Sequence, residues 1–148
     1  MPDRTPAETL TAAAQLLREA ATAATPGPWR HADTHLGQFG YTATVLTDRE
    51  SLTDTDLVAW LPSMSQTPWD EERKVWPTSA YIARVHPGVG LALAAWLAQA
   101  ARTHRAAESA ARRVWREDGD DHSRAEFIAA RTDQHALAVA RQLLGEIA

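Results

Sequence analysis

Two histidines and an aspartate at alternate positions form the most suggestive ligand set in the chain. His31, Asp33 and His35 lie at i, i+2 and i+4, and on a β-strand this spacing directs all three side chains to one face. Imidazole and carboxylate groups bind zinc, iron or manganese. Neighbours on one strand face are about 6–7 Å apart, so a single metal would require bent side chains or a bulge. A solvated sheet face is the plainer interpretation, and a metal site is the alternative.

A cluster of arginines lies in the C-terminal half of the chain. Between residues 102 and 116, Glu108 is the only acidic residue among five arginines, a composition that can bind phosphate or nucleic acid. On a helix these arginines face away from the apolar seam described below, where solvated charge is expected. We therefore favour an acidic protein partner over nucleic acid. The arginines predicted to contact that partner are Arg102, Arg105, Arg112 and Arg116.

Two tryptophans stand in a proline-punctuated stretch. Trp69 and Trp76 flank the charged residues 70–74, and large aromatic side chains dominate the binding energy of protein interfaces. Such side chains also pin long loops to a core. The sequence leaves recognition and anchoring equally open for both residues.

Other motifs indicate no catalytic site. The segment His86-Pro87-Gly88-Val89-Gly90 lacks the lysine and spacing of a phosphate loop. The aspartates at 118–121 lack the closing glutamate of a calcium loop. With no cysteine and no His-Glu-x-x-His motif, cysteine nucleophiles and the familiar zinc signatures are excluded. We predict no cofactor. Whether the protein is an enzyme stays open at this point, with a non-enzymatic protein favoured.

The N-terminal half predicts one helix and a small sheet. Thr5, Pro6 and Glu8 form a capping box with proline at the first helical position, and the helix should end at the segment 25–28, Thr-Pro-Gly-Pro. Alternating residues from Trp29 then predict a hairpin over 29–45, and the apolar run 57–61 predicts a third antiparallel strand. Trp29 and Trp60 are expected in the core.

The C-terminal half predicts helices. Residues 62–77 appear irregular with at most a helical turn over 70–75, and Thr78 is expected to cap a short helix. A long helix follows Pro87, and a capping box of Ser123 and Glu126 should open the last helix. The fold class is thus α+β: an N-terminal helix, a three-stranded antiparallel meander, a short helix and a long C-terminal helical hairpin. We predict one domain over 1–148, with 1–86 holding the first helix, sheet and loop, and 87–148 the hairpin.

An apolar seam on the long helix suggests self-association. Residues at alternating steps of four and three continue for about three heptads, a pattern typical of paired helices. We predict a homodimer whose seam includes Leu93, Leu97, His104 and Val114. His104, the one polar seam residue, could specify the partner or be hydrogen-bonded within the fold, and the second interpretation is preferred.

Composition sets the general class. The 148 residues carry a formal net charge of −4 and include 30 alanines. A chain of this length can bury one sizeable core without disulfides or metal. It has no apolar run long enough to span a bilayer, and no basic segment followed by an apolar stretch at its start. We expect a cytoplasmic, soluble protein with no membrane contact.

Two motifs together resemble a known group of small proteins. The segment Thr25-Pro26-Gly27-Pro28-Trp29 after a helix, and later Ala80-Tyr81-Ile82-Ala83 before Pro87 and a long helix, are similar to motifs of the Ead-like bacteriophage proteins and related actinobacterial domains of unknown function. The resemblance covers roughly residues 10–100. It implies a small antiparallel sheet after the first helix and a phage or mobile-element origin, and it supplies no catalytic or binding residues. The stiff proline turn should seat Trp29 in a structural joint, which Tyr81 and Ile82 close from the other side.

These observations favour a non-enzymatic accessory protein of phage or mobile-element type that acts through protein–protein contacts. The main alternative is a regulatory module that binds a small ligand or nucleic acid, including an antagonist of host defence. A metal-dependent hydrolase is the third interpretation.

Overall fold

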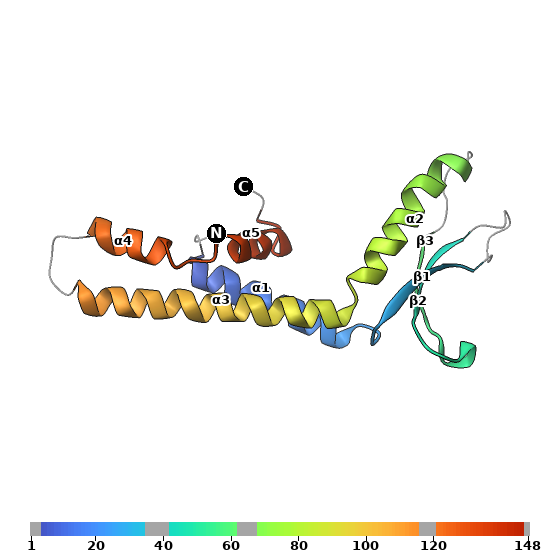
Figure 1. Ribbon diagram of the computed structural model, residues 1–148, viewed down its shortest axis with the longest axis horizontal. Coiled ribbons are helices and arrows are strands. Elements are labelled where there is room, and N and C mark those ends of the chain that lie inside the picture. Colours follow the sequence, from blue (N-terminus) through green and yellow to red (C-terminus); the bar gives the residue numbers. More distant parts are fainter. Residues whose placement is uncertain (1–3, 35–41, 62–67, 116–120, 147–148) are drawn as a thin grey trace. The chain divides into compact units, whose positions relative to one another are not determined.

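The computed structural model describes residues 4–34, 42–61, 68–115 and 121–146, without the side chains of Leu52 and residues 68–75. Helices and one three-stranded antiparallel sheet make up these segments, which confirms the predicted α+β class (Figure 1). In chain order the elements are α1 (Pro6–Ala23), β1 (Trp29–Asp33), β2 (Ala43–Thr47), the 3-10 helix η1 (Leu52–Asp54), β3 (Leu57–Leu61), α2 (Pro68–Arg84), α3 (Pro87–Val114), α4 (Asp121–Ala129) and α5 (Gln134–Leu143).

The chain divides into two compact units. The helical unit comprises Met1–Glu19 and Leu91–Ala148, and the sheet unit comprises Ala20–Gly90. The sequence predicts a single domain in which the first helix accompanies the sheet. Most of α1 lies in the helical unit, because its apolar stripe packs on α3 and α5, and the single domain stays a prediction.

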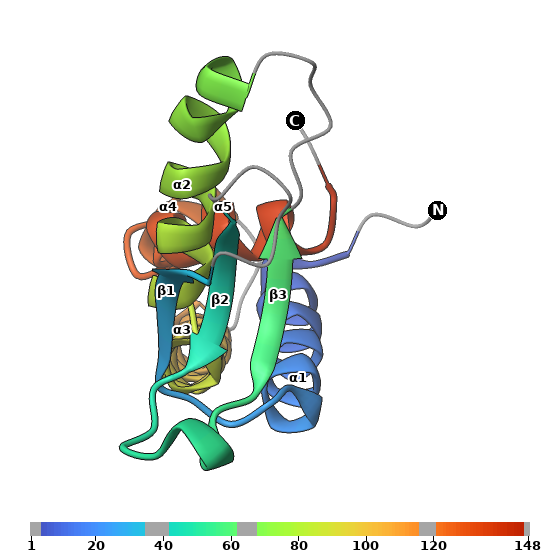
Figure 2. The same ribbon diagram turned by 90° about the vertical axis from the view of Figure 1, so that its right-hand side faces the viewer.

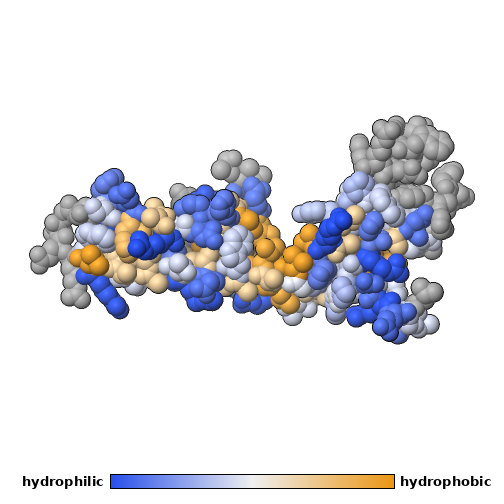
Figure 3. Space-filling view, viewed as in Figure 1, coloured by the Kyte–Doolittle hydropathy of each residue, from blue (hydrophilic) through white to orange (hydrophobic). Residues whose placement is uncertain are grey.

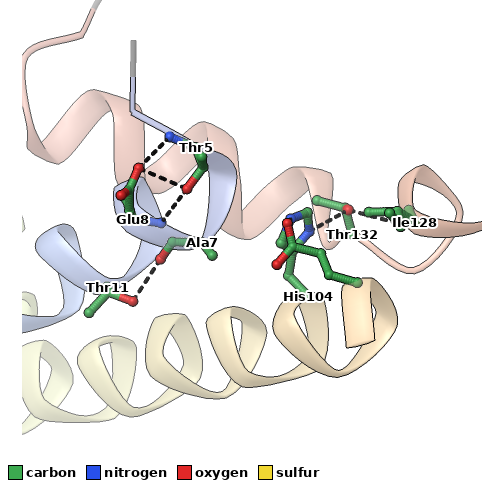
Figure 4. Close-up of polar contacts among 8 residues, drawn as sticks. Thr5, Ala7, Glu8, Thr11, His104, Ile128 and Thr132 are labelled. Carbon is green, nitrogen blue, oxygen red and sulfur yellow. Dashed lines mark hydrogen bonds and ion pairs between the residues drawn. The ribbon is translucent and has the colours of Figure 1, made fainter. Parts of the chain in front are cut away.

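Helix α1 begins where its capping box predicts. The Thr5 backbone N–H donates to Glu8 Oε2 at 2.8 Å, and the Glu8 N–H donates to Thr5 Oγ1 at 3.3 Å (Figure 4). These reciprocal bonds satisfy backbone donors that lack partners in the first helical turn. The helix ends at Ala23, just before the Thr-Pro-Gly-Pro segment, as expected.

The core of the helical unit is built largely from alanine. Three helices meet in it, and the small methyl groups let their backbones approach closely. No helix in the described ranges combines the length and apolarity needed to cross a membrane. The buried residues of this core are Leu10, Ala13 and Ala14 of α1, Leu97, Ala100 and Ala101 of α3, and Ala136, Leu137 and Ala140 of α5.

The predicted last helix is two helices, which corrects the C-terminal hairpin in detail. Ser123 lies inside α4, so it is not the cap that the sequence suggested. The chain breaks after α4, and Asp133 caps α5 by accepting the Ala136 N–H at 2.9 Å. The second carboxylate oxygen of Asp133 accepts the indole N–H of Trp96 at 3.2 Å. One side chain therefore starts α5 and ties it to α3.

Aromatic contacts hold α4 beside the end of α3. The rings of Trp115 and Phe127 meet edge to face with centroids 5.3 Å apart. The guanidinium carbon of Arg131 lies 3.5 Å from the centroid of the Phe127 ring, a cation–π geometry. None of the α4 residues is buried, and the Trp115–Phe127 contact joins α4 to the residue that follows α3.

The sheet unit contains the predicted meander. The strands lie in the order β1-β2-β3, with β2 central and β3 at an edge (Figure 2). Trp29 pairs with Thr47 and His31 with Val45 across β1 and β2. The β2–β3 register shifts at Val45/Leu46, which marks a β-bulge. Helix α2 packs on β1 and β2 and so covers one face of the sheet.

Helix α2 is longer than predicted. It runs without interruption from Pro68 to Arg84, with Pro77 inside it, so the irregular stretch predicted over 62–77 is wrong from residue 68 onward, as is the cap at Thr78, and residues 62–67 lie outside the described part of the chain. Proline lacks the N–H that would bond to the carbonyl four residues earlier. The buried hydroxyl of Ser79 donates to the Trp76 carbonyl at 2.8 Å, which adds a bond next to the interruption. Packing on the sheet outweighs the local cost of Pro77.

The Thr-Pro-Gly-Pro-Trp segment meets the start of α3 at His86. A Cβ placed on Gly27 would lie 2.8 Å from His86 Nδ1, so only glycine fits there without a shift. The same nitrogen accepts the Gly88 N–H at 3.1 Å, and the Trp29 indole donates to the Thr25 carbonyl at 3.0 Å. Trp29 is half-buried in this turn, whereas Tyr81 does not close it as expected, because its side chain is 68% exposed.

Replacing Asp133 should separate its two roles. We expect Asp133→Ala to lower the free energy of unfolding by about 1–2 kcal/mol, since it removes a helix cap and the acceptor of a tryptophan N–H. Asp133→Asn keeps an oxygen for the cap and should lose less. Urea unfolding followed by circular dichroism measures both, and equal losses for Ala and Asn would contradict this role.

Replacing Gly27 should reveal the close approach to His86. We expect Gly27→Ala to destabilise the protein by about 1–3 kcal/mol, the usual cost of overpacking. In a His86→Ala background the same change should cost much less, because the ring that obstructs the new methyl group is gone. Thermal unfolding of the four proteins in this double-mutant cycle measures the coupling. Additive effects would show that the contact is not limiting.

Candidate functional site

The predicted metal ligands on β1 are partly engaged by the fold. The His31 ring packs edge to face on Trp76 of α2, with centroids 4.5 Å apart, and its Nδ1 is buried without a hydrogen-bond partner among the described residues. Asp33 Oδ1 accepts the Thr42 N–H at 2.9 Å, which closes the end of the hairpin. His35 lies outside the described residues. Within those residues no group of three metal-binding side chains is present, so the metal site stays a prediction.

The contact between His31 and Trp76 also identifies the covered face of the sheet. Side chains alternate across a strand, so Arg30 and Ala32 face away from α2. The β2 and β3 residues paired with them share that orientation. We call this the outer sheet face, and its residues are Arg30, Ala32, Thr44, Leu46, Leu57 and Trp60.

Two large apolar side chains are exposed on the outer sheet face. Leu57 and Trp60 are each 53% exposed, although the sequence placed Trp60 in the core. The bulge explains the difference, because the register pairs Leu57 with Leu46 and Trp60 with Thr44. Without the bulge, residues three apart on β3 would face opposite sides. Periodicity alone gave no signal for this patch.

Of the two tryptophans left open by the sequence, Trp76 contacts the sheet. Its ring is half-buried against His31, which attaches α2 to β1. The side chain of Trp69 lies outside the described part of the structure. For Trp76 the geometry is that of an anchor, while recognition by Trp69 stays a prediction.

The predicted arginine cluster divides into separate environments. Arg105 reaches across to α1, where its NH2 donates to Thr11 Oγ1 at 2.8 Å. Arg102 donates through Nε and NH2 to Gln99 Oε1 on its own helix. Arg112 is exposed, and Arg116 lies outside the described residues. Blue hydrophilic side chains alternate with small pale-orange ones over this helical unit (Figure 3).

Arg102 and Arg105 line a groove between α1 and α3. Its volume is about 420 Å³, and all of its lining belongs to the helical unit. The lining residues are Thr11, Ala14, Gln15, Arg18 and Glu19 of α1 and Ala98, Ala101, Arg102 and Arg105 of α3. Arg102 and Arg105 belong to the arginine cluster that the sequence shows, whereas Arg18 is remote from it in sequence and carries no signal of its own.

The predicted oligomer seam is largely occupied within one chain. Leu97 belongs to the core shared with α1 and α5, and His104 is 4% exposed. Leu93 is half-buried, whereas Val114 is 68% exposed. The alanine-rich face that suggested dimerisation is therefore covered by the protein's own helices, and the homodimer stays a prediction.

His104 is hydrogen-bonded within the fold, as the preferred interpretation had it. The Thr132 hydroxyl donates to the Ile128 carbonyl at 2.9 Å, so it must accept from His104 Nδ1 at 2.8 Å (Figure 4). This network assigns the proton to Nδ1. Nε2 lies 3.5 Å from Glu108 Oε1. The buried imidazole thus links α3 to the end of α4.

Comparisons with protein-family models, with curated proteins and with solved structures found no match to this chain. Its functional assignment therefore depends on the residues and contacts above.

The bond between His104 and Thr132 can be tested by removing its acceptor. We expect Thr132→Val to lower the free energy of unfolding by about 1–3 kcal/mol, because a buried Nδ1–H loses its partner. Thr132→Ser keeps the hydroxyl and should cost less. Chemical denaturation of both variants measures the difference, and similar losses would assign the effect to packing of the methyl group.

Proposed function

We propose that this protein is a non-enzymatic binding protein that acts through protein–protein contacts on the outer sheet face. One observation carries the proposal: Leu57 and Trp60 are half-exposed on the same face of an edge strand. Tryptophan is among the residues that contribute most to interface binding energy. Covering both side chains with a partner would remove apolar surface from water, which is favourable.

The outer edge of β3 suggests how a partner would bind. Among the described strands β3 pairs only with β2, so its outer edge presents backbone donors and acceptors. An extended segment of a second protein can add there as a further strand, and its side chains would pack on Leu57 and Trp60. Main-chain bonds would supply affinity, and the two apolar side chains would supply selectivity.

The charge beside β3 indicates the chemistry of that segment. The loop that precedes β3 has exposed acidic side chains at Asp48, Glu50, Asp54 and Asp56, with Arg49 the basic residue among them. Asp48 is 3.8 Å from Arg30 on the outer sheet face. A partner strand with apolar residues opposite Leu57 and Trp60 and a basic end near this loop would be complementary.

The contacts made by three histidine side chains support a binding protein over an enzyme. His31 packs on Trp76, His86 accepts the Gly88 N–H, and His104 donates to Thr132. Each imidazole contributes to a structural contact. These three imidazoles are thus used in structural contacts, whereas Leu57 and Trp60 remain available.

We place this binding activity in a phage-type or mobile-element accessory protein. The resemblance of the Thr-Pro-Gly-Pro-Trp and Ala-Tyr-Ile-Ala motifs to Ead-like proteins supports that origin. Both motifs lie in the sheet unit, which also holds the outer sheet face. The genes that neighbour this one, whether early phage genes or a defence locus, provide an independent check.

Crosslinking followed by binding measurements tests the proposed surface. A photo-crosslinking residue at position 57 should trap a partner in the producing cells, and one at position 81 on α2 should not. The trapped protein is then purified and titrated. Trp60→Ala should weaken its binding by about 2 kcal/mol or more, roughly thirtyfold.

Tyr81→Ala is the matched control. Tyr81 is also a large exposed aromatic residue, at 68% exposure, and it lies on α2. Its replacement should leave the affinity nearly unchanged. Equal losses at Trp60 and Tyr81 would contradict the proposal, as would crosslinks that form only between copies of this chain.

A further inference from the structure

The groove between α1 and α3 has an alanine floor and an arginine rim. Ala14 and Ala101 are buried there, at 4% and 1% exposure, and Ala98 is half-buried beside them. Because these side chains are short, the groove has depth between the two helices. Arg18 approaches from α1, and Arg102 and Arg105 from α3. Both helices therefore contribute cations to the lining of the groove.

Hydrogen bonds hold two of these guanidinium groups in place. The Thr11 hydroxyl donates to the Ala7 carbonyl at 2.6 Å and accepts from Arg105 at 2.8 Å (Figure 4 shows the first bond). Gln99 Oε1 accepts from Arg102 at 2.6 and 3.1 Å. Each guanidinium carries five N–H donors in a planar fork, so most donors of Arg105 and several of Arg102 remain available. Such fixed forks bind phosphate or carboxylate oxygens in pairs.

The charge in the groove is positive. Three arginines line it against a single acidic residue, Glu19, whose Oε1 accepts from Gln15 Nε2 at 2.9 Å. The field of Arg105 also reaches Glu8, one turn before Thr11. Hydrogen bonds from the Thr5 backbone N–H and hydroxyl lower the pKa of Glu8, and the charges of Arg4 and Arg105 lower it further.

The size and lining of the groove limit the ligand. A volume of about 420 Å³ is near the lower end of the range for small-molecule sites. None of the lining residues is aromatic, so a nucleobase would find no ring on which to stack. A dianion with a short aliphatic body matches the positive rim and the methyl-lined floor.

We infer that this groove is a binding site for a compact phosphate monoester. The phosphate oxygens accept hydrogen bonds from Arg102 and Arg105, with the charge of Arg18 opposite, and the ester's aliphatic part lies on Ala98 and Ala101. This site is in the helical unit and is independent of the outer sheet face. Its occupant would be a metabolite-sized ligand, whereas the outer sheet face takes a protein.

Calorimetric titration with inorganic phosphate and glycerol phosphate tests the site. Ionic strength is held constant with chloride, because exposed charge interactions are screened by salt. We expect glycerol phosphate to bind the full-length protein with a Kd of about 1 mM or tighter, and more tightly than inorganic phosphate. Arg102→Gln and Arg105→Gln should each weaken binding by about tenfold.

Two further variants separate the site from general charge and from folding. Arg112→Gln removes an exposed arginine of α3 outside the groove lining and should leave affinity unchanged. Ala98→Leu fills the floor without changing charge and should abolish binding, while the circular dichroism spectrum confirms that the helices remain.

Three results would overturn the inference. The first is the absence of measurable heat with either anion at 10-fold the expected Kd, about 10 mM. The second is an equal loss of affinity in Arg112→Gln and Arg105→Gln, which would indicate a diffuse basic surface. The third is a single-stranded oligonucleotide that binds more tightly than glycerol phosphate and depends on Arg112, which would assign the arginines to a nucleic-acid backbone.

Discussion

The close approach of α1, α3 and α5 through alanine is the constraint on which the helical unit depends. Six of the nine residues in that core are alanines, so backbones come near each other and little volume remains for adjustment. A larger side chain in this core would push helices apart, because interiors are packed to the density of crystals. The same short side chains explain why Arg105 can reach Thr11 on the neighbouring helix. The core and the groove are thus consequences of one choice of residue type.

Single polar side chains fix the geometry where the helices and strands meet. The Asp133 carboxylate caps α5 and accepts from Trp96 of α3. His104 and Thr132 connect α3 to the end of α4, and His86 fits closely against Gly27 in the sheet unit. Each of these groups has two partners or a close neighbour, so each costs little when buried and much when one partner is removed.

The sequence predicted features that depend on local signals and missed those that depend on tertiary packing. The Thr5–Glu8 capping box and the proline stop after α1 are local, and both are present. Pro77 inside α2 violates a local rule, and only packing on the sheet makes it acceptable. The break at Asp133 carries a local cap signal that the apolar stripe obscured. The bulge at Val45/Leu46 has no glycine that would indicate it in the sequence. Because this bulge puts Trp60 on the same face as Leu57, the exposure of Trp60 could not be predicted.

Residue types alone placed Trp60 in the core and gave no reason to expect an exposed apolar pair on β3. Histidines and aspartates attract attention because of their chemistry, yet Asp33 and Asp133 accept backbone N–H groups and the His31 ring packs on Trp76. Side chains that the fold leaves exposed, or with unused hydrogen-bond donors, are better indicators of a binding site. In the sheet unit these side chains are the exposed Leu57 and Trp60 on an edge strand. In the helical unit they are the arginines that line the groove between α1 and α3. The apolar pair suits a surface that binds another protein, because covering it removes apolar area from water. The arginine-lined groove suits a small anion, because a few polar groups in a pocket fix the ligand.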